Sequence, residues 1–419
     1  MSAARIGMVT QWYDPERGSA AQPGIISRSL LRRGHRVDVV TGFPNYPSGH
    51  LYPGYAVRPY LRETIGGVTV HRVPLYPSHD TNPVRRATNY LSFSAAASVT
   101  ATWVLRDADA VLVHSTPATV AIPAVVLRVL RRKPYVVHVQ DLWPQTVVSS
   151  GFVDDARAGR MERALHVYCD AVYRRAAAIA VTSPGMAPLI AERGVSEDKI
   201  VFVPNWADEA SFRPVERDPA LAAALGITAA FTVMYAGNFG EFQALDVVVE
   251  AADRLHARSD IGFALVGGGV EEARLRRMVA ERGLANVTFV GPQPFERMAG
   301  ILALGDVQLV TLQDVPLFRT TLPSKLQGVL AAGRPVIAAV TGDAAAVVRE
   351  SGAGEVVRPG SSEELADAVL ALAATPSADL TARGTSGRAY YAGRFSEQVV
   401  GDRLSALLER AAEQGRAAR

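Results

Sequence analysis

The segment of this 419-residue chain with the clearest chemical potential is 318–336, which reads FRTTLPSKLQGVLAAGRPV. It contains Lys325, one of only three lysines in a chain that otherwise uses arginine for positive charge. Pro323 disfavours helix just before it, and Ser324 is well placed to cap a helix beginning at about Lys325. The helix dipole opposes a cation in the first turn, so a lysine there favours a doubly negative ligand such as a diphosphate.

Arg319 lies six residues before Lys325 and offers a second cation with a planar fork of donors. We expect the two side chains to act on the same anion. The alternative is that Lys325 is a surface lysine, with its stem on apolar residues and its ammonium in water.

Three turns that contain glycine follow predicted strands and lead toward helices. They carry Gly18 and Ser19 in QWYDPERGSAAQPG, Gly237, Asn238 and Gln243 in VMYAGNFGEFQALD, and Gly267 in LVGGGVEEARL. Small residues let backbone amides approach an anion, and a helix N-terminus adds positive dipole at the same place. Each turn taken alone is equally consistent with an ordinary strand-to-helix connection, and none matches a Walker loop or a dinucleotide fingerprint.

Two further loops in the first half follow predicted strands. VQDLWPQ places Asp141 and Trp143 at a strand end, and VHSTPAT does the same for His114. A carboxylate and an aromatic face bind sugars well, because the ring stacks and the carboxylate accepts hydroxyl protons. Asp141 is equally suited to cap the following turn, and His114 to a structural position.

Short β-branched runs alternate with Ala- and Leu-rich segments along the whole chain, which is typical of parallel sheets with helices on both faces. The pattern occurs twice, so we expect two doubly wound domains facing across a cleft, with ligands beyond the strand ends. The first set of predicted strands is Ile6–Thr10, Val37–Thr41, Val68–Val73, Ala110–His114, Tyr135–Val139, Ile179–Thr182 and Ile200–Val203. The second set is Thr232–Tyr235, Gly262–Val266, Val287–Val290, Val307–Leu312, Val336–Val340 and Glu355–Val357.

The predicted domains are 1–205 and 220–394, joined by a polar, Pro-containing linker at 206–219. A last helix, 395–419, is expected to pack back toward the first domain. Ser396 is a plausible N-cap for this helix.

Composition limits the function classes. Residues 1–210 hold 23 basic and 17 acidic residues, and 211–419 hold 21 and 24, so the positive charge lies in the first half. That half could meet an anionic membrane surface or a phosphorylated acceptor, although helix-end arginines are usually only solvated. Interleaved aromatics and a nucleic-acid motif are missing, so DNA and RNA are poor candidates.

A single cysteine, Cys169, excludes an intramolecular disulfide framework and favours a cytoplasmic location. No apolar run reaches the ~20 residues needed to cross a bilayer, and the N-terminus shows no signal-peptide core. The Ala-rich segment 90–105 is predicted to be a core helix. We expect no metal site, since Asp107 and Asp109 resemble an Asp-x-Asp motif only superficially.

Taken together, the motifs resemble the family-four retaining glycosyltransferases with the GT-B fold, over nearly the whole chain. Within that family they are most similar to bacterial surface-polysaccharide transferases of the WbuB and WcaI kind. The segments that carry the likeness, in order, are TGFPNYPSGHLYPGY, VPLYPSHD, NYLSFS, VQDLWPQ, VPNWAD, MYAGNFGEFQALD and LFRTTLPSKLQGVLAAGRPV.

The resemblance implies a nucleotide diphosphate sugar held mainly by the second domain, an acceptor held mainly by the first, retention of configuration, and no metal or other cofactor. The acceptor would be a lipid-linked sugar or a small natural product, with possible peripheral membrane contact through the basic first domain. It implies catalytic roles for Arg319, Lys325 and Asp141. The residues expected to bind the nucleotide sugar are Gly18, Ser19, Gly237, Asn238, Gln243, Gly267, Gln293, Thr321, Leu322 and Ser324, and those expected to bind the acceptor are Gln22, His114, Asp141 and Trp143.

The chain departs from the wider family at two places. The family has an Arg and a Lys where this chain has Asn238 and Gln243, and two glutamates, contacting sugar and ribose, where it has Thr320 and Gly328. The closer subgroup also favours the GN loop and the PSK element, so Lys325 and Arg319 are expected to supply the missing cations. Gln327 is a candidate for the ribose only if the helix turns it inward.

Two other functions remain open. A sugar-nucleotide 2-epimerase of the same architecture would also need a diphosphate site, and a protein that only binds sugar nucleotides would suit the missing glutamates. A nicotinamide oxidoreductase is disfavoured, because no strand-turn-helix carries the glycine fingerprint and the following acidic residue.

Overall fold

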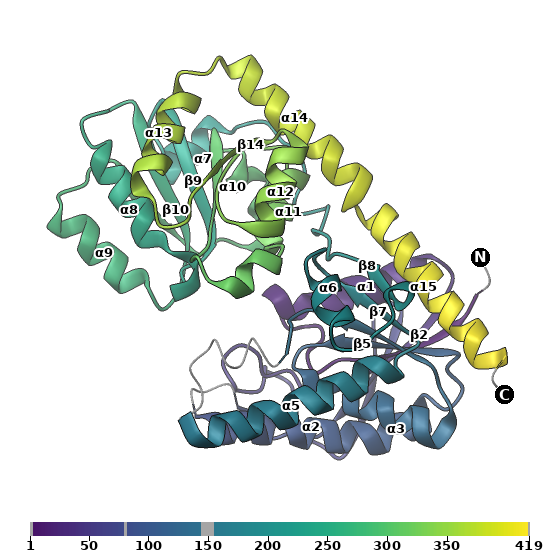
Figure 1. Cartoon of the computed structure of the whole chain (residues 1–419). Helices are drawn as coiled ribbons and strands as arrows, with labels where there is room; N and C mark the ends of the chain where they lie inside the picture. The colour runs from purple at the N-terminus through teal and green to yellow at the C-terminus, as the bar shows by residue number, and fades with distance from the viewer. Residues whose placement is uncertain (1–2, 79–81, 144–154, 418–419) are drawn as a thin grey trace. The chain divides into compact units, whose positions relative to one another are not determined.

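A computed structural model describes residues 3–78, 82–143 and 155–417 of the chain. The chain forms two compact units, one made of Met1–Pro204 with Val400–Arg419 and the other of Asn205–Val399. Each unit is built on its own sheet, with helices packed against it (Figure 1). The segment predicted as a linker, 206–219, belongs to the second unit.

The first unit contains, in its described residues, an eight-stranded sheet of order β3-β4-β2-β1-β5-β6-β7-β8. The strands are β1 (Arg5–Val9), β2 (Arg36–Gly42), β3 (Leu61–Ile65), β4 (Val68–Val73), β5 (Ala110–Ser115), β6 (Tyr135–Val139), β7 (Ala178–Val181) and β8 (Ile200–Phe202). All pairings are parallel except β3 with β4, which form a hairpin. The sequence interpretation missed β3, which stands at the edge of the sheet.

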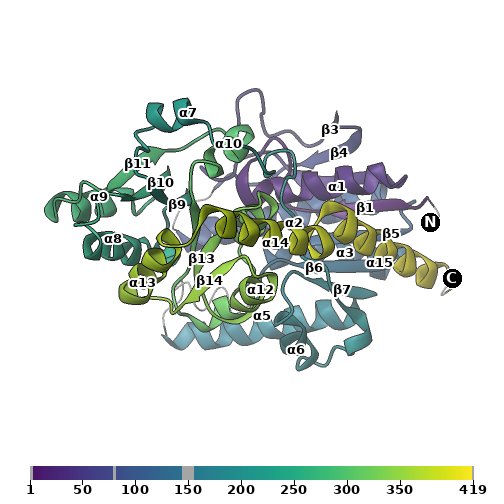
Figure 2. The same ribbon diagram turned by 90° about the horizontal axis from the view of Figure 1, so that it is seen from above.

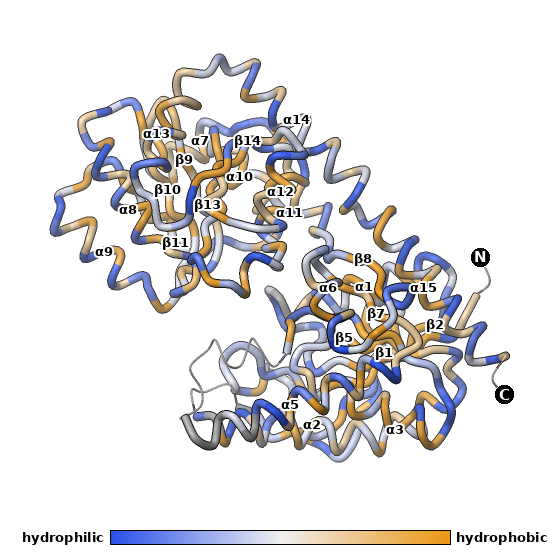
Figure 3. The backbone as a smooth tube through the Cα atoms, viewed as in Figure 1, coloured by the Kyte–Doolittle hydropathy of each residue, from blue (hydrophilic) through white to orange (hydrophobic). Residues whose placement is uncertain are grey.

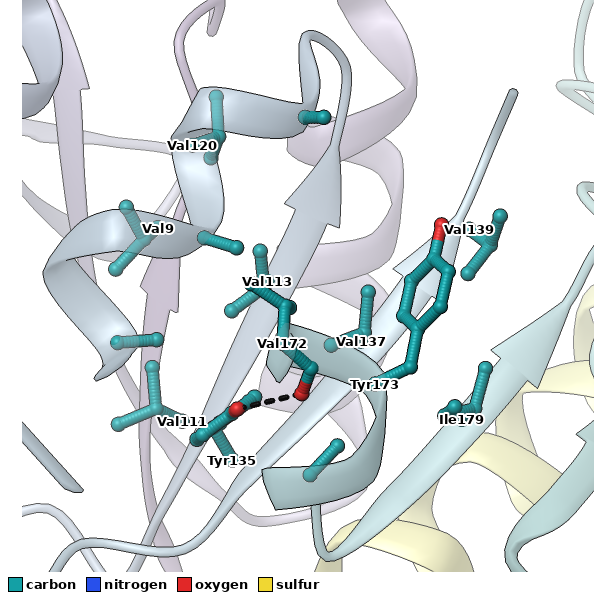
Figure 4. Close-up of a cluster of buried hydrophobic side chains, with 14 of the residues drawn as sticks. Val9, Val111, Val113, Val120, Tyr135, Val137, Val139, Val172, Tyr173 and Ile179 are labelled. Carbon is teal, nitrogen blue, oxygen red and sulfur yellow. Dashed lines mark hydrogen bonds between the residues drawn. The ribbon is translucent and has the colours of Figure 1, made fainter. Parts of the chain in front are cut away.

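The helices of this unit are α1 (Gln22–Arg32), α2 (Pro83–Val104), α3 (Ile122–Arg131), α5 (Asp155–Arg175), α6 (Met186–Ala191) and most of α15 (Glu397–Ala417). Short 3-10 helices stand at η1 (Gly18–Ala21), η2 (Ala118–Ala121) and η3 (Glu197–Lys199). The largest core cluster lies between the central strands and α2, α3 and α5. Figure 4 shows its valines around Tyr135, whose hydroxyl donates to the Val172 carbonyl at 2.7 Å. That hydrogen bond satisfies a polar group inside an otherwise apolar layer.

The second unit contains a six-stranded sheet of order β11-β10-β9-β12-β13-β14, parallel throughout. Its strands are β9 (Phe231–Asn238), β10 (Ile261–Gly268), β11 (Val287–Gly291), β12 (Val307–Thr311), β13 (Val336–Ala339) and β14 (Gly354–Val357). Its helices are α7 (Pro219–Ala224), α8 (Leu245–Arg254), α9 (Glu272–Glu281), α10 (Met298–Leu302), α11 (Ser324–Ala331), α12 (Gly342–Ser351), α13 (Ser362–Ala373) and α14 (Ser377–Arg394), with 3-10 turns η4 (Glu241–Gln243), η5 (Phe295–Arg297) and η6 (Pro316–Thr320). Apolar residues run through the central strands (Figure 3), as expected of strands covered on both faces.

The last helix, α15, belongs to the first unit from Val400 onward. It runs beside α1 (Figure 2), and the Arg33 guanidinium donates to Asp402 at 2.8 Å. The His35 ring lies 2.7 Å from the Ser405 hydroxyl, and Leu404 is fully buried. Two α/β sheets, parallel except for the β3–β4 hairpin, and a long terminal helix confirm the predicted fold class.

Candidate functional site

The structure places Lys325 in the first turn of α11, as the sequence predicted. Its ammonium nitrogen lies 3.2 Å from the centroid of the Tyr235 ring, on β9. A Cβ at Gly237 would stand 2.9 Å from both Cε and Nζ of Lys325, so the lysine occupies the space that a side chain at position 237 would need. The ammonium is thus held at the carboxyl end of β9, between an aromatic face and bare backbone.

Burial lowers the pKa of Lys325 well below its usual value. Desolvation is the one cause of this shift, and no described carboxylate lies within 4.0 Å of the ammonium. A ring face attracts a cation more weakly than a carboxylate does. The second unit therefore holds a buried lysine without a described anionic partner, and a bound anion would favour its charged form.

The glycine turns after β9 and β10 pack tightly against each other. Gly237 and Gly267 stand opposite each other in the sheet, and a Cβ at Gly267 would meet the Gly237 carbonyl oxygen at 1.9 Å. The Tyr235 hydroxyl donates to the Asn238 carbonyl at 2.7 Å. Gly267 therefore has a packing reason to be glycine, whatever ligand approaches it. The same contacts fix the loop over which Lys325 lies.

Asn238 is exposed at the end of β9, and Gln243 closes η4 just before α8. The Gln243 carbonyl accepts from the Thr311 hydroxyl at 2.6 Å, which ties this turn to the end of β12. Gln293, in the loop after β11, donates to the Val290 carbonyl at 3.3 Å. The side chains of Asn238 and Gln243 are neutral donors in the loop after β9, over which Lys325 lies.

Arg319 sits in η6, and its side chain is 61% exposed. Its nearest described carboxylate, Asp314, is 3.9 Å away. The Thr321 hydroxyl donates to the Leu317 carbonyl at 3.0 Å, and Leu322 is partly buried in the connection to α11. The structure thus holds Lys325 in place and leaves Arg319 largely in water.

The prediction that Ser324 caps α11 is wrong in this structure. Ser324 is the first residue of the helix, Pro323 occupies the cap position, and no side chain caps the helix N-terminus. The extended backbone at Pro323 ends the preceding segment without help from the serine hydroxyl. Ser324 is exposed at the same end of the helix.

In the first unit, Asp141 follows β6 and meets Thr116, which follows β5. The Thr116 hydroxyl lies 3.4 Å from the Asp141 carboxylate, and burial raises the pKa of that carboxyl. Adjacent parallel strands end at the same edge of the sheet, which explains why the two side chains meet.

His114 is buried at the end of β5, with its ring edge-to-face against His138 at 5.7 Å. Its Nδ1 has no partner among the described residues, and burial beside His138 lowers its pKa well below the usual value. Trp143 is half-buried against the core, and its carbonyl accepts from Arg193 at 2.7 Å. Both side chains are therefore packed against the core of the first unit.

Gly18 opens η1 with a positive φ of 68°, and Ser19 lies in the same turn. Gln22 begins α1, and its side-chain nitrogen is buried without a partner among the described residues. The turn leads directly into the N-terminus of α1, as predicted.

Two family models match the chain: one described as "Glycosyl transferase 4-like domain" over residues 17–206 and one described as "Glycosyl transferases group 1" over residues 230–375. The chain is 30% identical over 326 residues to the "Putative colanic acid biosynthesis glycosyl transferase WcaI" of Escherichia coli K12, covering 77% of this chain and 79% of the relative. It belongs to the family-four retaining glycosyltransferases.

A further relative and two solved structures are also similar to this glycosyltransferase. It is 26% identical to the "Probable glycosyltransferase WbjE" of Pseudomonas aeruginosa, over 74% of this chain and 77% of that one. Among solved structures, a sucrose-phosphate synthase from Thermosynechococcus elongatus superposes with a TM-score of 0.76 at 20% identity, covering 99% of this chain and 100% of that one. The Anabaena protein HepE, solved with UDP and glucose, gives 0.69 at 16% identity, covering 97% and 99%. The similarity of the chain to these two solved structures shows the GT-B fold.

At position 328, where the wider family has a glutamate, the glycosyltransferase has no room for a side chain. A Cβ on Gly328 would lie 2.9 Å from the Phe212 ring, which itself packs edge-to-face with Phe295 at 5.4 Å. Gln327 is turned inward and buried. The exchange of glutamate for glycine is therefore matched by an aromatic residue that fills the space.

Glu16 is a residue that the sequence interpretation missed. Its buried carboxylate accepts from the backbone amides of Tyr13 at 2.9 Å, and Asn45 and Tyr46, both at 2.8 Å. It joins the loop after β1, which carries Gly18, to the loop after β2. The available signal in the sequence was a glutamate between Pro15 and Gly18, in a loop that also carries an expected binding residue.

No group of three or more His, Cys, Asp or Glu able to hold a metal ion occurs within residues 3–78, 82–143 and 155–417. In those same ranges, no helix is both long and apolar enough to span a bilayer.

Proposed function

We propose that the enzyme transfers a sugar from a nucleotide diphosphate sugar to an acceptor hydroxyl, with Lys325 taking the charge of the departing diphosphate. The observation that carries this proposal is the position of Lys325. Its ammonium lies at the carboxyl end of β9, in the first turn of α11, without a described carboxylate partner. The carboxyl edge of a doubly wound sheet is where such folds bind ligands.

In the proposed reaction the bond between the anomeric carbon and the diphosphate oxygen breaks, and negative charge grows on the diphosphate. The acceptor oxygen bonds to the same face of the sugar, and its proton passes to a diphosphate oxygen. Lys325 and the positive end of the α11 helix dipole stabilise the leaving group without a bound metal. Arg319 is exposed enough to close on the diphosphate as a second cation.

The nucleotide that we propose is uridine diphosphate, with guanosine diphosphate as the competing choice. The structures of HepE include complexes with UDP and with UDP-glucose, which supports uridine for this chain. The side-chain amides of Asn238 and Gln243, in the loop after β9, can donate hydrogen bonds to the phosphates or the sugar of the nucleotide sugar.

The acceptor is proposed to be a lipid-linked sugar, handled by the first unit near Asp141 and Thr116. The name of the relative WcaI places that protein in colanic acid biosynthesis, which supports a polysaccharide precursor here. The basic first half of the chain suits an acceptor presented at the cytoplasmic face of an anionic membrane. A small natural product is the alternative acceptor.

Calorimetric titration with UDP and GDP, followed by mass spectrometry with the matching sugar nucleotides, tests the proposal. A product heavier than the acceptor by one sugar residue, made only when both substrates are present, is the expected result. A new sugar nucleotide formed without any acceptor would instead identify a 2-epimerase. Tight nucleotide binding with no turnover over a broad acceptor panel would identify a binding protein, the outcome suggested by the filled position 328.

A further inference from the structure

Helix α2 is apolar on the side that faces away from the sheet as well as on the side that faces it. Phe93 and Ala97 are buried against the first unit's core. On the opposite side, at helical spacing, Val84, Leu91 and Val99 are between 55% and 74% exposed. The expectation that 90–105 is a core helix therefore holds for one face only. A helix that is apolar all round normally has both sides covered.

Helix α3 extends this surface. It packs beside α2 in the same helical layer (Figure 1) and exposes Val129 and Leu130 near its end. Together with Trp103 at the end of α2, these residues form what we call the α2–α3 face: Val84, Leu91, Val99, Trp103, Val129 and Leu130. Exposed apolar residues gathered on neighbouring elements mark interaction surfaces, whereas single ones need no explanation.

Within α2 and α3 themselves the charges have one sign. Neither α2 nor α3 contains an aspartate or glutamate. The arginines on or directly after the two helices are Arg85, Arg86, Arg106, Arg128, Arg131 and Arg132. Asp107 is exposed nearby and is paired with Arg106. The pattern of valine, leucine and tryptophan bordered by arginine is that of helices lying in a membrane interface.

We propose that the α2–α3 face docks on a bilayer that contains anionic phospholipid, with α2 lying in the plane of the interface. A second copy of the chain is a poorer occupant, because a two-fold contact through this face would bring the arginine borders together. Anionic headgroups instead neutralise those arginines while the apolar side chains enter the acyl boundary.

The proposal deepens the proposed function, because a docked enzyme would meet a lipid-linked acceptor at the membrane surface. It rests on the proposed function only for this biological role. The α2–α3 face belongs to the first unit and contains neither Lys325 nor any residue proposed to contact the donor. Its test therefore needs no sugar nucleotide, and its failure is distinct from failure of the transferase assignment.

The test is flotation of the purified full-length chain with vesicles, either of phosphatidylcholine alone or with about one third phosphatidylglycerol. Binding to the phosphatidylglycerol vesicles that weakens with added salt is expected. Leu91→Glu with Val99→Glu should lower the vesicle-bound fraction by about tenfold or more, because charge enters the apolar contact. Val270→Glu is the matched control, since Val270 is 85% exposed on the second unit and should leave binding unchanged.

The arginine border is tested separately. Arg128→Glu and Arg131→Glu should each weaken binding to the anionic vesicles by about fivefold or more. These positions are exposed, so the variants should fold, which circular dichroism and thermal melting verify.

Several results would overturn the proposal. These are absence of vesicle binding, equal binding to both vesicle types, or binding that the Leu91 and Val99 substitutions do not change. Dimerisation of the lipid-free chain in analytical ultracentrifugation, lost in the Val99→Glu variant, would assign the face to a second copy instead.

Discussion

The contact between Lys325 and Tyr235 explains how a lysine can be held in a helix's first turn without a carboxylate. The Tyr235 ring attracts the ammonium, and the Tyr235 hydroxyl holds the loop that carries Asn238. Such a contact is worth roughly 1–2 kcal/mol where the cation is shielded from water.

Tyr235→Leu should therefore raise the dissociation constant for the donor nucleotide by about 5- to 30-fold. Tyr235→Phe keeps the ring and should retain most of the affinity. Calorimetry on both variants measures the difference. Equal losses in the two would assign the effect to the hydroxyl and the loop, and would contradict a role for the ring.

The lowered pKa of Lys325 predicts a pH dependence for donor binding. Above that pKa the lysine of the free enzyme is neutral, while a bound diphosphate raises the pKa and keeps the ammonium charged. Donor binding should then take up a proton, and affinity should fall as the pH rises through the lowered pKa.

Calorimetry in buffers of different ionisation enthalpy measures this proton uptake. Lys325→Arg keeps its charge throughout the range, so its affinity should change less with pH. If the native protein and Lys325→Arg showed the same pH profile, the titration would belong to another group.

At this scale the sequence was informative about Lys325, because a lysine at an unfavourable helix position stands out. It could not indicate Tyr235 or Phe212, because their roles depend on which strand and loop pack against α11. It also indicated Ser324 as a cap, whereas Pro323 takes that position in the structure.

At the scale of elements, Glu16 holds two loops of the first unit together by accepting from three backbone amides. Glu16→Ala would leave those amides without their acceptor in a buried site. We expect a loss of about 2–4 kcal/mol in the stability of the first unit. Hydrogen exchange at Tyr13, Asn45 and Tyr46 should accelerate most.

Arg17→Ala, at the exposed neighbouring position, is the control for Glu16→Ala and should change neither stability nor exchange. Unchanged protection of the three amides in Glu16→Ala would show that other contacts hold the loops.

The positions of the buried strands could be anticipated because such strands read as apolar, β-branched runs, and the runs at Tyr135–Val139 and Val307–Thr311 are clear examples. Edge strand β3 was missed because it is half-exposed and alternates with charged residues. The outward face of α2 was also misread, since composition cannot say which side of an apolar helix is covered.

At the scale of the whole molecule, the chain returns to the first unit through α15 after completing the second. Leu404 on this helix is fully buried, and the neighbouring Ser405 contacts His35. Leu404→Ala should therefore destabilise the first unit by about 2–4 kcal/mol, because it leaves a cavity beneath the helix.

Differential scanning calorimetry with and without UDP can assign the effect of Leu404→Ala to one unit. The transition that UDP does not stabilise should fall in temperature, and Arg410→Ala, on the exposed side of the same helix, should leave it unchanged. A fall confined to the UDP-sensitive transition would contradict the assignment of α15 to the first unit.

In the proposed transfer, the Lys325 ammonium takes the charge of the departing diphosphate. The most direct test is the kcat/KM for sugar transfer of Lys325→Ala, measured beside Lys199→Ala, a change at a lysine outside the second unit. Loss of one preorganised charge contact costs ~2–4 kcal/mol in the transition state, so Lys325→Ala should be roughly 30- to 1,000-fold slower and Lys199→Ala unchanged. A correctly folded Lys325→Ala enzyme with native kcat/KM would contradict the account.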